Sequence, residues 1–191
     1  MQKMNQKMLV ALLASIPMLA MAHPGHEFPE LGFLSGFFHP FTGLDHMSMA
    51  VGLGVLLYKA NQRWQFNGLL GLGFALMFGF AVGTQHWLSA NVAEYGIVAS
   101  LLFLAYGLWR KQERSLPMAT VSLAVFHGMA HGTELGGHGH WAALMLGMVS
   151  AMAILYVLGL GLAAVLQRVL PQQGRKIVAT MVAVVGFLGL A

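Results

Sequence analysis

Long apolar runs separated by short polar segments make up most of the chain, and six of them are long enough to cross a bilayer. A membrane-spanning helix needs about 20 mostly apolar residues. The runs are continuous rather than alternating, and an open sheet cannot exist in lipid. The predicted spans are Leu31–Leu57, Phe66–Trp87, Val92–Trp109, Leu116–Leu135, Trp141–Leu166 and Lys176–Leu190. The pattern therefore predicts an all-α polytopic membrane protein with six transmembrane helices.

A shorter apolar run at the amino terminus is typical of a cleaved secretory signal peptide. Two lysines give it a basic start, and Ala20 and Ala22 supply the small-x-small cleavage pattern. The alternative is an uncleaved first transmembrane helix, which Pro17 and the short run argue against. We expect residues 1–22 to be the signal peptide and residues 23–191 to form one six-helix membrane domain.

Composition agrees with the apolar pattern. Hydrophobic residues make up 58% of the 191 residues and charged residues 8%, whereas soluble domains carry about 25% charged residues. This excludes a soluble enzyme, a nucleic-acid-binding module and a disordered chain. The sequence has no cysteine, so disulfides and thiolate metal sites are excluded too. Nine histidines outnumber the six carboxylates.

The basic residues predict the orientation in the membrane. If residue 23 lies outside, every lysine and arginine beyond the signal peptide falls in a predicted inner loop. These residues are Lys59, Arg63, Arg110, Lys111, Arg114, Arg168, Arg175 and Lys176. A positive-inside pattern this clean predicts that both ends of the mature chain are periplasmic. The net charge of +4 is thus a topology signal, and no nucleic-acid partner is needed to explain it.

The span count also permits an internal repeat. Two blocks of three spans enter the membrane in opposite orientations. This is the topology of a 3+3 inverted repeat, in which a site forms at the midplane. The 24 glycines fit close helix packing. The predicted small-xxx-small contacts are Gly32/Gly36, Gly79/Gly83 and Gly128/Gly132.

The first predicted span contains His39, Asp45 and His46. Ionisable side chains inside an apolar segment cost several kcal/mol unless something pairs with them. Pro40 and Gly43 predict that the helix bends or unwinds here, and irregular backbone at that depth is tolerated where it lines a cavity. A structural hydrogen-bond cluster is the alternative for one such residue. Three within eight positions favour a functional site.

The fourth predicted span contains His127, His131 and Glu134, spaced four and three apart. That spacing places all three on one face of a helix. Two histidines at i and i+4 form a common chelating pair for a transition metal, and a carboxylate one turn further on can complete it. The sequence therefore predicts metal ligands on both the first and the fourth span.

Depth along the two spans predicts that these ligands meet. At ~1.5 Å per residue, Asp45 and His46 lie about 20 Å from the outer end of the first span. His127 lies about 17 Å from the inner end of the fourth. Both positions are near the middle of a membrane roughly 30 Å thick. His39 and His131 fall in the outer half, so we expect one metal path that descends from outside.

Imidazole and carboxylate ligands without sulfur suit nickel, cobalt, zinc or copper(II) rather than calcium or magnesium. Met47, Met49 and Met129 lie beside the two motifs, where core packing is favoured over a role as soft ligands. Five further histidines lie on the predicted outer side, where they either capture metal or belong to solvated loops. These are His23, His26, His86, His138 and His140.

At these motifs the chain resembles the HupE/UreJ family of bacterial nickel/cobalt permeases. His39 followed after five residues by Asp45-His46 is similar to the family's first-span pattern. Phe126 to Glu134 is similar to its Phe-His-Gly-x-Ala-x-Gly-x-Glu pattern. The resemblance implies transport of Ni²⁺ or Co²⁺ across the inner membrane from periplasm to cytoplasm, as an accessory to hydrogenase, urease or cobalamin enzymes.

We expect a secondary permease whose substrate is the ion and which needs no other cofactor. His39, His131 and Glu134 would strip water from the ion, and Asp45, His46 and His127 would hold it at the centre. The absence of a Walker A pattern disfavours ATP-driven uptake by this chain. The main alternative is a membrane-embedded zinc hydrolase using the same residues, assisted by Glu134 or Ser48. A sensor or accessory subunit is a third reading. The preferred metal, the driving force and the oligomeric state stay open.

Overall fold

The computed structural model describes residues 32–110, 115–135 and 140–189, and every regular element within these ranges is a helix. The helices are α2 (Phe33–Thr42), α3 (Leu44–Leu57), α4 (Gln62–Gly83), α5 (Ala90–Arg110), α6 (Ser115–Leu123), α7 (Val125–Leu135), α8 (Trp141–Val169) and α9 (Gly174–Leu188). The all-α prediction is confirmed. The predicted signal peptide and His23, His26 and His138 lie outside the described residues.

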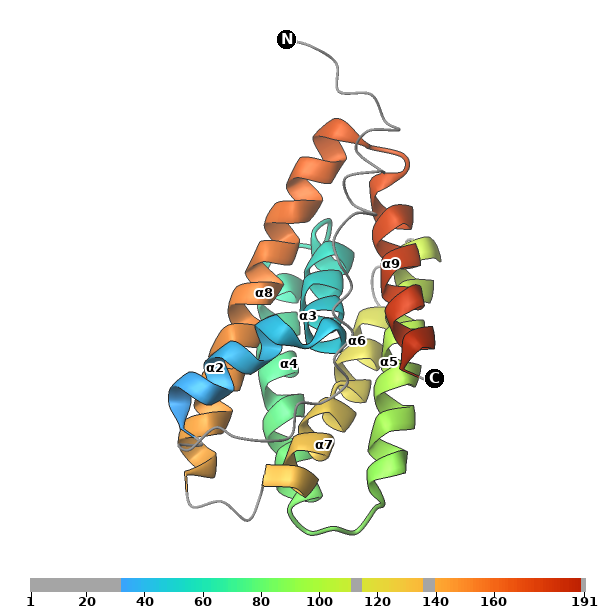
Figure 1. Ribbon diagram of the computed structural model, residues 1–191. Helices are drawn as coiled ribbons and strands as arrows, with labels where there is room; N and C mark the ends of the chain where they lie inside the picture. Colours follow the sequence, from blue (N-terminus) through green and yellow to red (C-terminus); the bar gives the residue numbers. More distant parts are fainter. Residues whose placement is uncertain (1–31, 111–114, 136–139, 190–191) are drawn as a thin grey trace.

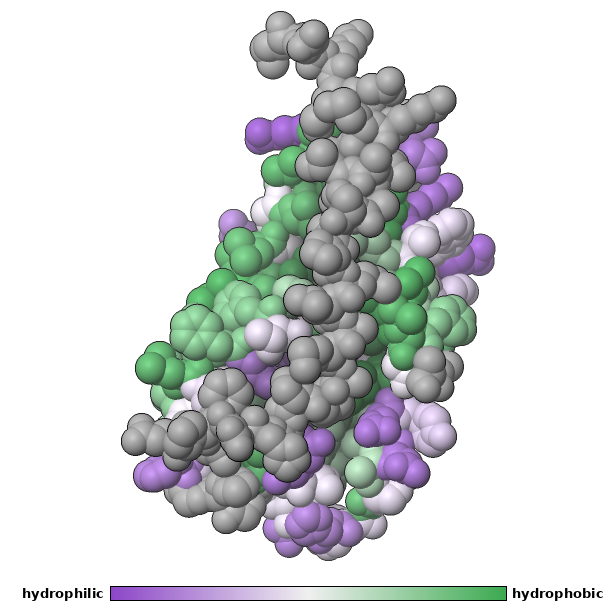
Figure 2. Space-filling view, in the orientation of Figure 1, coloured by the Kyte–Doolittle hydropathy of each residue, from purple (hydrophilic) through white to green (hydrophobic). Residues whose placement is uncertain are grey.

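Three helices, α4, α5 and α8, are long and apolar enough to cross a membrane. Large apolar side chains cover their outward faces; Phe74 of α4 and Leu146 of α8 are examples. Figure 2 shows hydrophobic residues across the middle of the molecule and hydrophilic ones toward its two ends. An exposed apolar surface of this kind fits lipid better than water. The other predicted spans appear as α2 followed by α3, α6 followed by α7, and the short α9, so the count of six stays a prediction.

The first predicted span breaks into two helices at Gly43, as Pro40 and Gly43 predict. Gly43 is extended, with φ −88° and ψ 116°. Its N–H donates to the carbonyl oxygen of His39 at 3.2 Å and closes α2, and α3 begins at Leu44. The break places His39 and His46 on different helices that meet at the corner.

The fourth predicted span is also broken, between α6 and α7, which the sequence pattern did not indicate. At the buried Ala124 the helical hydrogen bonds tighten by one residue. The N–H of His127 donates to the carbonyl oxygen of Ala124 at 3.1 Å, three residues back instead of four. Neither proline nor glycine occurs at this position, so the break could not be predicted from residue type.

Glycines bring α4 and α7 into backbone contact. A Cβ on Gly79 or Gly83 of α4 would overlap the carbonyl oxygens of Val125 and Met129, respectively, on α7. Gly128 and Gly132 of α7 face the carbonyls of Leu76 and Phe80 on α4 in the same manner. Two of the three predicted glycine pairs therefore form the tight contact expected of them. This packing fixes the helix that carries two of the histidines.

Only one member of the glycine pair predicted on the first span, Gly36, makes the expected close helix contact. Gly36 of α2 meets the carbonyl of Leu144 on α8, whereas Gly32 has nothing within 4 Å. The reciprocal contact comes from Gly147 of α8. Further along α8, Gly159 packs on α3, and Gly54 of α3 packs back on α8. The helix α8 therefore holds both halves of the broken first span.

The two ends of the bundle differ in charge. The α3–α4 turn, the carboxyl end of α5 and the α8–α9 turn lie toward the same end, at the top of Figure 1. They carry the basic residues that the structure describes, which are Lys59, Arg63, Arg110, Arg168, Arg175 and Lys176. The α4–α5 turn and the carboxyl end of α7 lie toward the opposite end. We refer to these as the basic end and the opposite end.

Candidate metal centre

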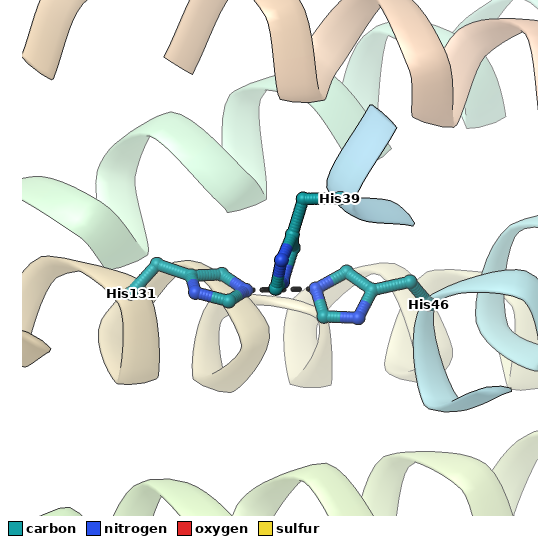
Figure 3. A group of neighbouring side chains, drawn as sticks. All are labelled: His39, His46 and His131. Atoms are coloured by element: carbon teal, nitrogen blue, oxygen red, sulfur yellow. Dashed lines mark hydrogen bonds between the residues drawn. The ribbon is translucent and has the colours of Figure 1, made fainter. Parts of the chain in front are cut away.

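Three histidines from three helices converge on one point between the helices. His39 of α2, His46 of α3 and His131 of α7 each offer a ring nitrogen within 4.8 Å of the others. The rings of His46 and His131 lie end to end with their Nε2 atoms pointing at each other, and the ring of His39 stands nearly perpendicular to both (Figure 3). Ring centroids are 4.7 to 5.1 Å apart. Residues far apart in the sequence thus form a single imidazole cluster.

The closest approach in the cluster joins two ring nitrogens. Nε2 of His46 lies 2.8 Å from Nε2 of His131. Without an ion, one of these nitrogens donates a proton to the lone pair of the other. With an ion about 2.0–2.1 Å from each nitrogen, both lone pairs point at the metal, and two ligands at right angles are about 2.9 Å apart. The two nitrogens could therefore bind one metal ion with little rearrangement.

Asp45 lies behind His46 rather than in the three-histidine group. Its Oδ1 accepts a hydrogen bond from Nδ1 of His46 at 3.0 Å. A carboxylate on one ring nitrogen fixes the tautomer and leaves the other nitrogen's lone pair free for metal. Asp45 was expected among the ligands of the central set. In the structure, Oδ1 of Asp45 orients the ring of His46 through this hydrogen bond.

His127 lies on the other side of Asp45. Its Nε2 is 3.8 Å from Oδ2 of Asp45, and its ring centroid is 5.3 Å from that of His46. The side chain is completely buried, and among the described residues neither ring nitrogen has a hydrogen-bond partner. A buried imidazole without a partner is unfavourable in an apolar interior, so this residue needs an explanation beyond packing.

Five of the six predicted ligands are brought together, and Glu134 is not. His46 and His131 are 4% and 3% exposed, and the Asp45 side chain is 32% exposed. Glu134 is exposed near the carboxyl end of α7 and is not a member of the three-histidine group. His46 was expected with Asp45 and His127 and lies beside both, with its Nδ1 3.0 Å from Oδ1 of Asp45 and its ring centroid 5.3 Å from that of His127, while its Nε2 faces His131. Exposed His86 and His140 lie in the segments before α5 and α8.

One residue of the centre had a role that sequence reasoning missed. A Cβ on Gly43 would lie 2.8 Å from Nδ1 of His46 and 2.9 Å from Oδ1 of Asp45. These are the two atoms that form the orienting hydrogen bond. Gly43 therefore both ends α2 and leaves room for the Asp45–His46 pair. The sequence feature that could have indicated this role is a glycine two residues before an Asp-His pair.

The fold and the centre define an all-helical protein with membrane-length helices around a buried histidine cluster. The chain belongs to the HupE / UreJ protein family, whose model matches residues 10–189. Protein HupE of Rhizobium leguminosarum bv. viciae is 28% identical over 167 residues, which cover 84% of this chain and 85% of that protein. No solved structure matches the chain.

Proposed function

We propose that this protein is a secondary permease that carries Ni²⁺ or Co²⁺ from the periplasm to the cytoplasm across the inner membrane. The observation that carries the proposal is the convergence of His39, His46 and His131 inside a bundle with an apolar outer surface. Ionisable groups buried among lipid-facing helices mark ion pathways more often than they serve packing. The metal is the substrate of the site and not a resident cofactor.

The ligand chemistry supports a borderline transition metal. Three imidazoles with a carboxylate nearby and no thiolate suit Ni²⁺, Co²⁺ or Zn²⁺ and disfavour Ca²⁺ and Mg²⁺. The family resemblance favours Ni²⁺ or Co²⁺ within this group. Buried methionines contribute packing: Met49 is part of the hydrophobic core. The donor set thus supports the proposed substrate class.

The distribution of charge supports the proposed direction. The basic end faces the cytoplasm by the positive-inside rule, which places the carboxyl end of α7 and the exposed Glu134 on the periplasmic side. There Glu134 attracts the hydrated cation before it reaches the cluster. His39, which is less buried than His46 and His131, is the first imidazole that an ion from outside meets.

The packing supports a 3+3 inverted repeat as the frame for transport. The first helix of each predicted half is broken, at Gly43 and at Ala124. The helix α4 packs on α7 through glycines, and its counterpart α8 packs on α3 through glycines. The third helices α5 and α9 also pack against each other. Transporters of this kind hold substrate at broken helices where the halves meet and rock one half against the other.

Uptake of radiolabelled nickel and cobalt by cells that express the full chain tests the proposal. Wild type is expected to take up one of the two ions well above vector-only cells, and His131→Ala is expected to reduce uptake to that background. The matched control is Ser150→Ala on α8, whose hydroxyl donates to the carbonyl of Leu146 within its own helix. It is expected to retain uptake within about twofold. All variants are compared at equal membrane abundance.

Two outcomes contradict the proposal. Wild-type uptake at background for Ni²⁺, Co²⁺ and Zn²⁺ alike means that the chain does not import these ions. Full uptake in the His131→Ala variant means that the ion follows a path outside the histidine cluster.

Uptake is expected to fall in acid. An imidazole titrates near pH ~6.5, and a proton occupies the lone pair that the metal needs. Protons therefore compete with the ion for the imidazole ligands, and the uptake rate is expected to decline as the pH falls. The measurement is the initial rate in proteoliposomes with equal pH on both sides and constant free ion. A rate that is flat or rises on acidification contradicts the prediction.

A further inference from the structure

We propose that the four histidines and Asp45 form two metal positions used in succession. The outer position consists of His39, His46 and His131, and the inner position consists of His127 with Asp45. This inference rests on the proposed permease function and adds an order of events to it. The two positions share the Asp45 carboxylate, which contacts one histidine of each.

The first observation is that the histidines do not form a single group. The ring nitrogens of His39, His46 and His131 lie within 4.8 Å of one another, and His127 is not part of that set. Three imidazoles can hold a small divalent ion, and water can supply the remaining ligands. The fourth histidine is therefore not needed to complete the outer position.

The second observation is that His127 is buried without a partner. It is 0% exposed, and within the described part of the chain neither ring nitrogen has a hydrogen-bond partner. Nε2 of His127 and Oδ2 of Asp45 are 3.8 Å apart. That is too long for a hydrogen bond, but both atoms can lie about 2.0–2.2 Å from one ion with a wide angle at the metal. The spacing of these two atoms is therefore better suited to a shared ion than to a direct hydrogen bond.

The third observation is the direction from one position to the other. His127 precedes His131 by four residues on α7, which is about 6 Å along the helix axis. The helix α7 runs away from the basic end toward the opposite end (Figure 1). A step from His131 to His127 thus moves the ion toward the basic end, which is the cytoplasmic side in the proposed orientation.

The carboxylate makes the step electrostatically feasible. Oδ1 of Asp45 accepts from His46 at 3.0 Å while Oδ2 faces His127. The carboxylate would bind the ion directly in the inner position and would be bonded to its ligand His46 in the outer position. Its negative charge therefore compensates the ion in both positions. The inner position offers fewer protein ligands than the outer one. A weaker second position favours release, because conduction needs binding that the ion can also leave.

Binding and uptake measured on the same variants test this order. The purified full chain is titrated with Co²⁺ and Ni²⁺ in detergent, and uptake is measured in cells. His127→Gln is expected to keep the affinity within about threefold of wild type and to lower uptake at least tenfold. His131→Gln is expected to lose both binding and uptake. The control variant Ser150→Ala is expected to change neither.

The outcomes separate this inference from the proposed function. Equal loss of affinity in His127→Gln and His131→Gln means a single site and overturns the two positions. Full uptake in His127→Gln overturns the inner position alone. If wild type imports no ion, the proposed function fails, and the order of steps fails with it.

Spectroscopy on wild type covers the case in which His127→Gln does not fold. X-ray absorption of the Co²⁺-loaded or Ni²⁺-loaded wild type is expected to show about three imidazoles on the resting ion. A resting ion with one imidazole and a carboxylate overturns the assignment of the outer position.

Discussion

Replacing Asp45 by asparagine is expected to weaken Ni²⁺ or Co²⁺ binding by about 10- to 100-fold, the usual cost of losing a carboxylate behind a metal-bound histidine. Uptake is expected to fall close to background. The side-chain amide can still accept the hydrogen bond from Nδ1 of His46, which Asp45 now accepts at 3.0 Å. The variant therefore keeps the shape of the centre and removes its charge.

The loss of charge is the reason for so large an effect. An ion with two positive charges that meets only neutral imidazoles in a low-dielectric interior is poorly compensated. Asp45 is the carboxylate that lies against the cluster, with one oxygen facing His46 and the other facing His127. In the proposed mechanism this one charge serves both metal positions, so both binding and movement depend on it.

Isothermal titration of the purified Asp45→Asn variant, beside uptake in cells, measures the effect. Asp45→Ala removes the hydrogen bond as well as the charge and is expected to bind more weakly than Asp45→Asn. Glu134→Gln is the matched control, because it removes an exposed carboxylate that is not a member of the three-histidine group. It is expected to lower uptake at low ion concentration without changing the affinity of the buried centre. Unchanged affinity in Asp45→Asn would show that the carboxylate charge is not used.

The sequence predicted the parts of the fold that a single residue type determines. Proline cannot donate a helical hydrogen bond and glycine has a low helix propensity, so the break at Gly43 followed from local chemistry. Glycines spaced by four predicted close helix contacts at Gly79/Gly83 and Gly128/Gly132, because only a residue without a Cβ permits backbones to approach this closely. The pattern did not indicate that these two pairs pack on each other. Ionisable residues within two apolar runs likewise predicted that the ligands of the first and fourth spans converge on one path.

Other features depend on tertiary packing and were beyond the sequence pattern. The break at Ala124 is a shift of hydrogen bonds that neither proline nor glycine marks. Depth counted along a helix is uncertain by about one turn, or 5.4 Å, and ignores tilt. Within that margin His46 lies beside both His127 and His131, with ring centroids 5.3 and 5.0 Å apart, so counting depth could not assign it to one group. Glu134 shares a face with His131 by spacing, yet it lies three residues nearer the end of α7 and is exposed.

Gly79→Ala in α4 is expected to destabilise the protein by about 3 kcal/mol, the upper end of the usual cost of overpacking. The added methyl would overlap the carbonyl oxygen of Val125 and lie 3.0 Å from the backbone nitrogen of Met129 on α7. Backbone atoms cannot rotate away as a side chain can, so the two helices must separate. For a chain of this size the loss corresponds to a drop of about 6–12 °C in the unfolding midpoint.

Gly161→Ala in α8 makes the comparison decisive, because it has the same chemistry without the collision. A Cβ at Gly161 would have nothing within 4 Å. Both substitutions gain the helix propensity of alanine over glycine, up to about 1 kcal/mol, so Gly161→Ala is expected to leave the midpoint unchanged or raise it slightly. Thermal unfolding of both variants in the same detergent measures the difference. Gly79→Ala also moves α7, which carries His127 and His131, so its metal affinity is expected to fall together with its stability. Equal midpoints for the two variants would mean that α4 and α7 do not pack through their backbones.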